Sequence, residues 1–326
     1  MKPGPARLCL GILTCLIFSP RPGARGAEEE PPAAASAARI KAHVQALAVR
    51  IGERNPYRPR ALLNARDYIR DELARYGYAP ELQEYRGKGL PAFPEEAVFY
   101  NVVAALGEDR KSEAGIWVVG AHYDSAPGTP GADDNASGVA VLLELARLLR
   151  GKTLDKELRL VAFSTEEPPS FGTKNMGSHH YAQRLKARGE KVRGMISLEM
   201  LGYYSPKPKS QRYPPILRWL YPDRGDFIAL VGDLPSLSFL RSVRKTWRAR
   251  SDFPLETAGL PRFIPAISLS DHLNFWQAGF PALMLTDTAF FRNPNYHTTA
   301  DTPETLDYER MAKLTETLAA VLEKGR

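Results

Sequence analysis

The chain has almost no cysteine. Its 326 residues include two, Cys9 and Cys15, and both lie in the first 26 residues. The remainder of the chain therefore forms no disulfide bond, which is compatible with an oxidising compartment but does not require one. Internal repeats and heptad runs are also absent, which argues against a solenoid or a coiled coil. Because 44% of the residues are hydrophobic, a chain of this length can bury a large core, and we expect a single domain.

An apolar run at the N-terminus is too short to span a membrane as an ordinary helix. Residues 8–19 (LCLGILTCLIFS) follow a basic segment with Lys2 and Arg7, and they precede small residues that end at Gly26. This order is typical of a secretory signal peptide. We expect residues 1–26 to be a signal peptide and the protein to be secreted or periplasmic, with a retained membrane anchor as the alternative.

Neither charge is in large excess once this leader is set aside. The formal net charge of the chain is +7, and the leader holds four basic residues (Lys2, Arg7, Arg21 and Arg25) and no acid, so 7 − 4 leaves +3. This balance argues against a nucleic-acid partner. The basic run at 241–250 (RSVRKTWRAR) fits the solvent face of a helix. After cleavage of the leader no stable membrane partner is expected.

Short apolar segments alternate with helical patterns along the rest of the chain. We expect strands at 81–86, 98–106, 115–121, 158–163, 192–198, 227–231 and 280–285. We expect helices at 39–51, 60–76, 137–150, 176–189, 235–248, 272–278 and 307–324. This alternation predicts an α/β fold with a mostly parallel central sheet flanked by helices. Small and polar residues at 27–38 predict a linker before a single domain at 39–326.

Five short segments carry side chains that bind metals in proteins. They are His122-Tyr-Asp124, GADDNASG at 131–138, Ser164-Thr-Glu166-Glu167, Ser197-Leu-Glu199 and Tyr296-His297-Thr-Thr-Ala-Asp301. His122, Glu166 and Glu199 fall at or just after the ends of expected strands. Ligands of mostly parallel sheets bind beyond the carboxyl ends of the strands. The expected fold therefore brings residues that are distant in the sequence to one edge of the sheet.

The residue types match a zinc centre. Zinc accepts imidazole nitrogen and carboxylate oxygen, and a catalytic zinc keeps one position open for water. Two histidines, His122 and His297, and three carboxylates can hold two ions if one carboxylate bridges them. In the tandem Glu166-Glu167, one carboxylate can be a ligand while its neighbour acts as general base on the metal-bound water. Asp124, two residues after His122, can accept the imidazole N–H and fix its tautomer.

The ordered set of HxD, PGADDNASG, EE, a carboxylate after a strand and YHTxxDT resembles the two-zinc aminopeptidases. This is a family of zinc exopeptidases related to glutaminyl cyclase and glutamate carboxypeptidase. The resemblance spans roughly residues 40–325. It implies the zinc-exopeptidase (phosphorylase/hydrolase-like) architecture, a catalytic domain at 39–326, and the activity of a zinc metallopeptidase on peptide substrates.

The resemblance also implies a role for each residue of the set. The family's metal ligands fall on His122, Asp134, Glu167, Glu199 and His297. One zinc ion would lie on His122 and Glu199, the other on Glu167 and His297, with Asp134 bridging them. Glu166 matches the general base, which would shuttle a proton from the metal-bound hydroxide to the leaving amine. Characterised aminopeptidases usually have Asp at the position of Glu199, which is one methylene shorter.

Several activities are compatible with this set. An aminopeptidase that hydrolyses N-terminal residues is the first expectation. A glutaminyl cyclase-like acyltransferase is an alternative, and so is a carboxypeptidase, since Arg262 or Arg292 could pair with a C-terminal carboxylate. A peptidase-like binding domain without activity is the non-enzymatic alternative. The sequence does not give the preferred side chain.

Residues 203–266 separate two of the metal-ligand segments and are rich in proline and aromatic side chains. Long segments of this kind are often functional lids. We expect this region to form a wall of the substrate pocket, with Trp219, Tyr221 and Phe227 affecting substrate preference.

Four other histidines lie outside the set. The pair His179-His180 is interpreted as surface or packing residues, and His43 as structural. The pair Asp271-His272 either caps the helix at 272–278 or contacts substrate.

Overall fold

The structure is a computed structural model of the chain that describes residue 1 and residues 32–107, 115–213 and 217–324. Apart from residue 1, the expected signal peptide at 1–26 lies outside the described residues, so secretion stays a prediction. No helix in the described part of the chain is long and apolar enough to cross a membrane.

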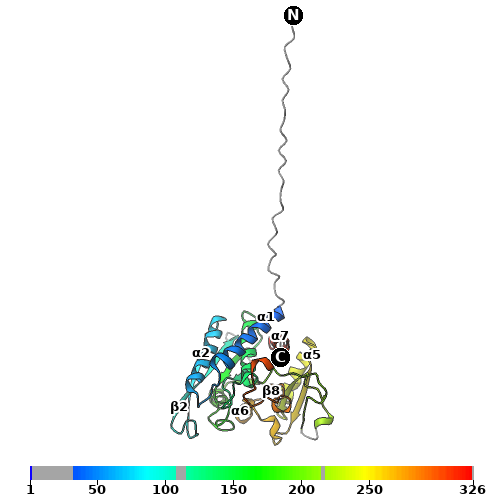
Figure 1. The fold of residues 1–326 in the computed structure, drawn as a ribbon. Coiled ribbons are helices and arrows are strands. Elements are labelled where there is room, and N and C mark those ends of the chain that lie inside the picture. Colours follow the sequence, from blue (N-terminus) through cyan, green and yellow to red (C-terminus); the bar gives the residue numbers. More distant parts are fainter. Residues whose placement is uncertain (2–31, 108–114, 214–216, 325–326) are drawn as a thin grey trace. The chain divides into compact units, whose positions relative to one another are not determined.

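A mixed sheet of eight strands forms the centre of the domain that begins at Pro32 (Figure 1). The strand order is β1-β2-β4-β3-β5-β8-β6-β7. The strands are β1 (Glu81–Gly87), β2 (Ala97–Leu106), β3 (Ile116–His122), β4 (Glu157–Phe163), β5 (Val192–Glu199), β6 (Ile228–Asp233), β7 (Leu255–Leu260) and β8 (Ala282–Thr286). The central strands β4, β3, β5 and β8 are mutually parallel. Strands β2 and β6 pair antiparallel with this central group.

Helices cover both faces of the sheet. One face packs against α1 (Pro32–Gln45), α2 (Pro59–Arg75), α3 (Gly138–Leu149), α5 (Leu237–Arg250) and α7 (Tyr308–Lys324). The other packs against α4 (Gly177–Ala187) and α6 (His272–Ala278). Shorter helical turns are Ala46–Ile51, Ala132–Ser137, Leu217–Trp219, Pro265–Ile267, Ala289–Phe291 and Pro303–Thr305. This three-layer arrangement confirms the predicted α/β fold.

Strand β3 shows why these apolar segments become central strands. All of its residues are buried, and successive side chains of a strand point to opposite faces. Trp117 and Val119 lie in the core under α3 and α7, whereas Ile116 and Val118 lie in the core under α4 and α6. A strand that is apolar at every position can therefore satisfy both layers, as parallel sheets require.

The expected linker at 27–38 is wrong from Pro32 onward. Helix α1 begins there, and Ser36 is buried and donates a hydrogen bond to Glu144 Oε1 at 2.6 Å. Arg39 forms an ion pair with the same carboxylate at 3.0 Å. The physical reason is the alanine-rich composition, because alanine has the highest helix propensity. The resulting helix α1 packs against α3 and α7.

Residues 203–266 contain more regular secondary structure than expected. The strand β6 and the helix α5 within this range were expected, but β7 was not. Strand β7 pairs in parallel with β6 at the edge of the sheet. Most residues of β7 are only partly buried at this edge. Its sequence, LETAGL, therefore lacks the alternation of apolar residues that indicates a strand.

Candidate metal centre

The predicted metal-binding residues come together at the carboxyl edge of the parallel strands. His122 and Glu199 are the last residues of β3 and β5. Glu167 lies just beyond β4, Asp134 lies in the turn before α3, and His297 lies in the loop after β8. Together with Glu166, these side chains form three overlapping groups, in each of which the potential ligand atoms lie within 4.8 Å of one another. Residues far apart in the sequence, such as His122 and Glu199, thus meet because β3 and β5 are neighbouring parallel strands.

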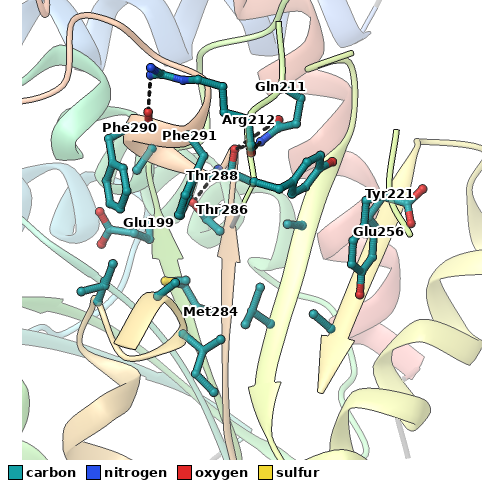
Figure 2. A pocket seen from close by; sticks show the side chains of 18 of the residues that line it. Glu199, Gln211, Arg212, Tyr221, Glu256, Met284, Thr286, Thr288, Phe290 and Phe291 are labelled. Carbon is teal, nitrogen blue, oxygen red and sulfur yellow. Dashed lines mark hydrogen bonds between the residues drawn. The ribbon is translucent and has the colours of Figure 1, made fainter. Parts of the chain in front are cut away.

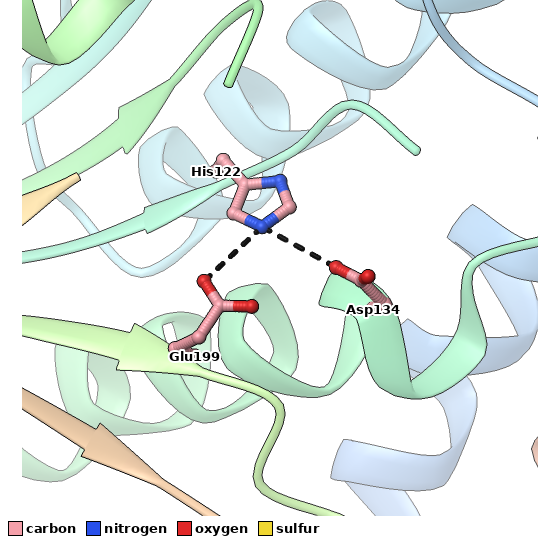
Figure 3. Close-up of side chains that lie close together, drawn as sticks. All are labelled: His122, Asp134 and Glu199. Carbon is pink, nitrogen blue, oxygen red and sulfur yellow. Dashed lines mark ion pairs between the residues drawn. The ribbon is translucent and has the colours of Figure 1, made fainter. Parts of the chain in front are cut away.

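The carboxylate of Asp134 lies between the two histidines. His122 Nε2 is 3.5 Å from Asp134 Oδ1 and 3.3 Å from Glu199 Oε2 (Figure 3). His297 Nε2 is 3.1 Å from Asp134 Oδ2 and 3.2 Å from Glu167 Oε2. One oxygen of Asp134 therefore faces each histidine, which divides the donors into two sets that share this carboxylate.

Unpartnered atoms in this cluster fit a bound cation. His122 is fully buried, and neither of its ring nitrogens has a hydrogen-bond partner among the described residues; the same holds for Glu167 Oε1. Buried polar atoms of native proteins are almost always satisfied. Imidazole nitrogen and carboxylate oxygen are the ligands that zinc takes in proteins. The donor set therefore fits zinc.

The shifted pKa values of the cluster also fit a bound cation. Burial raises the pKa of Glu167 to about 8, and the neighbouring Asp134 adds to this. Burial also raises the pKa of Glu166 well above its ordinary value, with contributions from Glu199 and Glu167. Burial lowers the pKa of His297, but its contacts with Asp134 and Glu167 outweigh this and raise the pKa to about 10. The cluster is a concentration of negative charge that divalent cations would neutralise.

Two aspartates outside the ligand set hold the backbone of the ligand segments. Asp124 Oδ1 accepts a hydrogen bond from the backbone N–H of Glu166, and Oδ2 accepts one from Glu167, both at 3.0 Å. The predicted contact of Asp124 with the imidazole is longer, at 3.5 Å between Oδ1 and Nδ1 of His122. Asp301 holds the segment that carries Asp134 in the same way. Its Oδ1 accepts a hydrogen bond from the backbone N–H of Asp133 at 2.8 Å, and its Oδ2 accepts one from the backbone N–H of Asp134 at 3.1 Å.

The glycines of GADDNASG are required by close packing. A Cβ on Gly131, which has φ +60°, would overlap the carbonyl oxygen of Asp134 and lie 2.6 Å from Ser125 Cβ. A Cβ on Gly138 would lie 2.7 Å from the carbonyl oxygen of Leu198. The turn can therefore press against β5, which brings Asp134 close to Glu199.

Three residues beside the cluster have strained backbone conformations. Thr165, Met200 and His297 have positive φ angles of 55°, 49° and 56°, in a region that costs a residue other than glycine about 1–3 kcal/mol. Thr165 directly precedes Glu166, and its hydroxyl donates to the carbonyl oxygen of Asn175 at 2.7 Å. Strain of this kind persists where the surroundings fix the backbone, and it is typical of functional sites.

Two residues outside the expected site support the cluster. Arg54 is fully buried and donates to the carbonyl oxygens of Tyr123, Pro130 and Gly131 at 2.7 to 2.8 Å. It thereby joins the end of β3 to the turn that carries the aspartates. Ser270 Oγ donates to an oxygen of the Glu199 carboxylate at 2.7 Å. The sequence has no signal for Arg54, which lies far from every ligand segment.

The remaining histidines have packing partners. His43 lies between the hydroxyls of Tyr68 and Tyr76, at 2.7 and 3.0 Å, as expected of a structural residue. His180 stacks on Tyr85 with 4.4 Å between ring centroids. His272 Nε2 lies 2.6 Å from the carbonyl oxygen of Ile267.

Asp271 directly precedes α6, but its side chain makes no capping hydrogen bond to that helix. Burial raises its pKa to about 7. The structure therefore gives no support to the capping alternative.

A large pocket adjoins the metal cluster (Figure 2). It encloses about 910 Å³ counted out to its open mouth, and Glu199 is part of its wall. Tyr221 and Phe227 of the 203–266 region also line it. Trp219, which was expected to act with them, does not line the pocket; it is 78% exposed.

Comparison with known proteins agrees with the geometry. The model of peptidase family M28 matches residues 101–322 of the chain. The chain belongs to peptidase family M28. The predicted zinc-exopeptidase family is thereby confirmed, and with it the expectation of a metallopeptidase.

The curated relatives differ in how much of their length is matched. The uncharacterized protein YfbL of Escherichia coli is 42% identical over 269 residues, which are 80% of this chain and 79% of that protein. Aminopeptidase YwaD of Bacillus subtilis is 45% identical over 88 residues, 27% of this chain and 18% of that protein. A probable zinc metalloprotease of Pyrenophora tritici-repentis is 27% identical over 255 residues, 70% of this chain and 51% of that protein. The matches thus span about half or less of the two named enzymes.

Solved structures share the fold. LapB from Legionella pneumophila has a TM-score of 0.67 at 22% identity, over 91% of this chain and 75% of that one. The glutaminyl cyclase of Porphyromonas gingivalis has a TM-score of 0.65 at 22% identity, over 86% and 95%. An aminopeptidase from Aneurinibacillus has 0.65 at 19% identity, over 89% and 93%.

Proposed function

We propose that the protein is a zinc aminopeptidase that removes N-terminal residues from peptides with two zinc ions. The observation that carries the proposal is that Glu199 belongs both to the metal-binding cluster and to the wall of the pocket. A side chain in this pocket is therefore next to the cluster, so the bond cleaved would be the one beside that residue.

The ligand assignment follows the two donor sets. His122 and Glu199 would hold one ion, Glu167 and His297 the other, and Asp134 would contribute one oxygen to each. Zinc bound there would supply a polarised scissile carbonyl and an attacking water of lowered pKa.

Glu166 is the proposed general base. Its Oε2 lies 3.9 Å from His122 Nε2, so the carboxylate reaches the cluster without contacting the second histidine. In the proposed reaction Glu166 takes a proton from the attacking water and gives it to the leaving amine. Asp124, by holding the backbone N–H groups of Glu166 and Glu167, keeps base and ligand apart and oriented. The pocket would hold the first side chain of the peptide and exclude water from it.

The carboxypeptidase alternative loses its support. Arg292 is buried and donates to Gln211 Oε1 and to the carbonyl oxygen of Phe227, both at 2.8 Å. Arg262 is paired with Asp233 at 2.6 Å. Neither arginine is among the residues that line the pocket, so neither is placed to bind the terminal carboxylate of a peptide held there.

The glutaminyl cyclase alternative fits the pocket less well. Cyclisation needs a site for one short amide side chain, whereas the residues that line this pocket extend well beyond such a site. Its floor runs across three strands, along Thr286, Ala229 and Glu256. This length supports hydrolysis of peptides with larger first residues.

A matched set of substrates tests the proposal. The purified protein is incubated with zinc and with aminoacyl p-nitroanilides, their N-acetylated counterparts, and a peptide with N-terminal glutamine. We expect release from the free amines, none from the acetylated forms, and loss of activity with a chelator that zinc reverses. Cyclisation of glutamine without hydrolysis of any nitroanilide would show that the protein is a cyclase instead.

A further inference from the structure

We propose that the pocket selects a basic N-terminal residue, lysine or arginine, and that Glu256 binds its charged head. This inference rests on the proposed aminopeptidase function, because it names the substrate class of the same site. Three features of the pocket carry it: a row of residues along its floor, a carboxylate without a partner, and aromatic rings beside that carboxylate.

The floor is a row of four side chains on neighbouring strands. In the register of the sheet, Glu199 of β5 lies opposite Thr286 of β8. Thr286 lies opposite Ala229 of β6, and Ala229 lies opposite Glu256 of β7. All four line the pocket. Adjacent strands lie about 4.8 Å apart, so Glu199 and Glu256 stand roughly 14 Å apart along the backbone. The two residues between them are small, which leaves a groove that begins at the metal cluster and ends at a carboxylate.

Apolar residues form the next row of the floor. Met284 of β8 pairs with Val231 of β6, and Val231 pairs with Ala258 of β7. All three line the pocket. A groove with apolar sides and a carboxylate at its far end matches one kind of amino acid, because lysine and arginine combine a long apolar stem with a cationic head.

Glu256 has no ion-pair or hydrogen-bond partner within the described part of the chain. Burial raises its pKa, and the charge of Arg248 offsets this only in part. The other long polar side chain in this wall is already engaged, since Gln211 donates to Thr288 and accepts from Arg292. Glu256 is therefore the acidic group of the pocket wall, away from the metal cluster, that can accept a ligand.

Two tyrosines lie at the same end of the pocket. The rings of Tyr213 and Tyr221 stack with 5.8 Å between centroids and an angle of 27°, and both line the pocket. The hydroxyl of Tyr221 donates to the carbonyl oxygen of Thr257, next to Glu256, at 3.1 Å. Figure 2 shows Tyr221 beside Glu256, across the pocket from Glu199. Aromatic faces attract cations, arginine in particular, so they reinforce the carboxylate.

The cationic side chain of the pocket wall, Arg212, points away from Glu256. Arg212 donates from Nη2 to the carbonyl oxygen of Phe290 at 2.6 Å. Figure 2 shows this guanidinium above Phe290, on the side of Glu199 and away from Glu256. The positive charge of Arg212 is thus kept from the end of the pocket where the basic head would lie.

The test uses ligands whose binding does not depend on turnover. Binding of L-arginine hydroxamate and L-methionine hydroxamate to the zinc-loaded protein is measured by calorimetry. Both side chains are unbranched along their stems, the arginine side chain being longer and charged, and both hydroxamates chelate zinc through the same group. Wild-type protein is compared with Glu256→Gln and with the control Glu84→Gln, an exposed glutamate on β1 at the opposite edge of the sheet.

We expect wild-type protein to bind the arginine ligand about 10- to 100-fold more tightly than the methionine ligand, as a charge-assisted hydrogen bond gives. Glu256→Gln should lose this preference while binding methionine hydroxamate as before, and Glu84→Gln should keep it. Equal binding of the two ligands by wild-type protein, an unchanged preference in Glu256→Gln, or no binding of either ligand would overturn the inference.

The same three proteins are then assayed with Arg- and Met-p-nitroanilide. The ratio of their kcat/KM values should follow the binding preference. If neither nitroanilide is hydrolysed although the hydroxamate preference depends on Glu256, the proposed function fails and the assignment of the pocket stands. If both nitroanilides are hydrolysed and Glu256→Gln changes neither rate, the proposed function stands and the assignment of the pocket fails.

Discussion

Replacing Asp124 with asparagine tests how the metal centre is held together. Asp124 is fully buried, and its two oxygens each accept a backbone N–H, from Glu166 and from Glu167. Asparagine keeps the size of the side chain but offers one oxygen and one NH₂ group. One N–H would therefore keep a neutral acceptor, while the other would face a donor.

The magnitude follows from these two bonds. A hydrogen bond to a charged group contributes about 1.5–3 kcal/mol and a neutral one about 0.5–1.5, while a buried donor left unsatisfied costs about 1–3 kcal/mol. The substitution should therefore lower the free energy of unfolding of the metal-free protein by about 2–4 kcal/mol. It should also weaken zinc binding about 10- to 100-fold, as loss of groups that orient metal ligands typically does.

Urea unfolding of the metal-free protein and competition with a chelator for zinc measure the two effects. Asp71→Asn, at an exposed position of α2, serves as the control and should change neither. Wild-type stability together with wild-type zinc affinity in Asp124→Asn would refute the reasoning. A loss of stability with unchanged zinc affinity would mean that Asp124 supports the fold but not the ligands.

Elemental analysis of the purified protein should give close to two zinc ions per chain, and a chelator should abolish activity that zinc restores; full activity with one tightly bound ion would contradict the shared role of Asp134. Tyr221→Ala and Phe227→Ala should change the relative kcat/KM of aminoacyl nitroanilides more than the zinc content, and unfolding without a change in selectivity would remove that role. Burial lowers the pKa of His43 from 6.5 to about 4, so between these pH values the unfolded chain binds a proton that the folded chain does not. Stability should therefore fall by up to about 3 kcal/mol as the pH falls through this window, and urea unfolding of His43→Gln should lack this component.

The grouping of the candidate metal ligands could be predicted because these residues follow strong local signals. His122 and Glu199 end two apolar segments, and such segments become neighbouring parallel strands whose carboxyl ends share one edge. The tandem Glu166-Glu167 follows a third strand, β4. The type of each side chain then limits the chemistry to metal binding and proton transfer.

Other parts of the structure have no such local signal. Arg54 acts through three carbonyl oxygens, and backbone acceptors are the same at every position of a sequence. Strand β7 is stabilised by its pairing with β6 rather than by its own composition. The pairing that aligns Glu199 with Glu256 depends on the register of four strands, which composition and periodicity leave undetermined.

The helix from Pro32 illustrates a different limit. A segment of small residues is compatible with a linker or with a helix, and local composition alone does not decide between them. The deciding contact is the buried carboxylate of Glu144, which binds Ser36 and Arg39 from more than 100 residues away in the sequence.

The assignment of Glu166 as base and Glu167 as ligand is the centre of the proposed mechanism, and a paired measurement tests it most directly. For Glu166→Gln and Glu167→Gln, kcat on an aminoacyl nitroanilide and zinc content are determined together. Glu166→Gln should keep both ions and lose about 10² to 10⁴ in kcat, because glutamine does not accept the proton. Glu167→Gln should lose zinc, because Glu167 lies 3.2 Å from His297 Nε2 in the second donor set. Near-normal kcat in Glu166→Gln, or loss of zinc as great as in Glu167→Gln, would contradict the account.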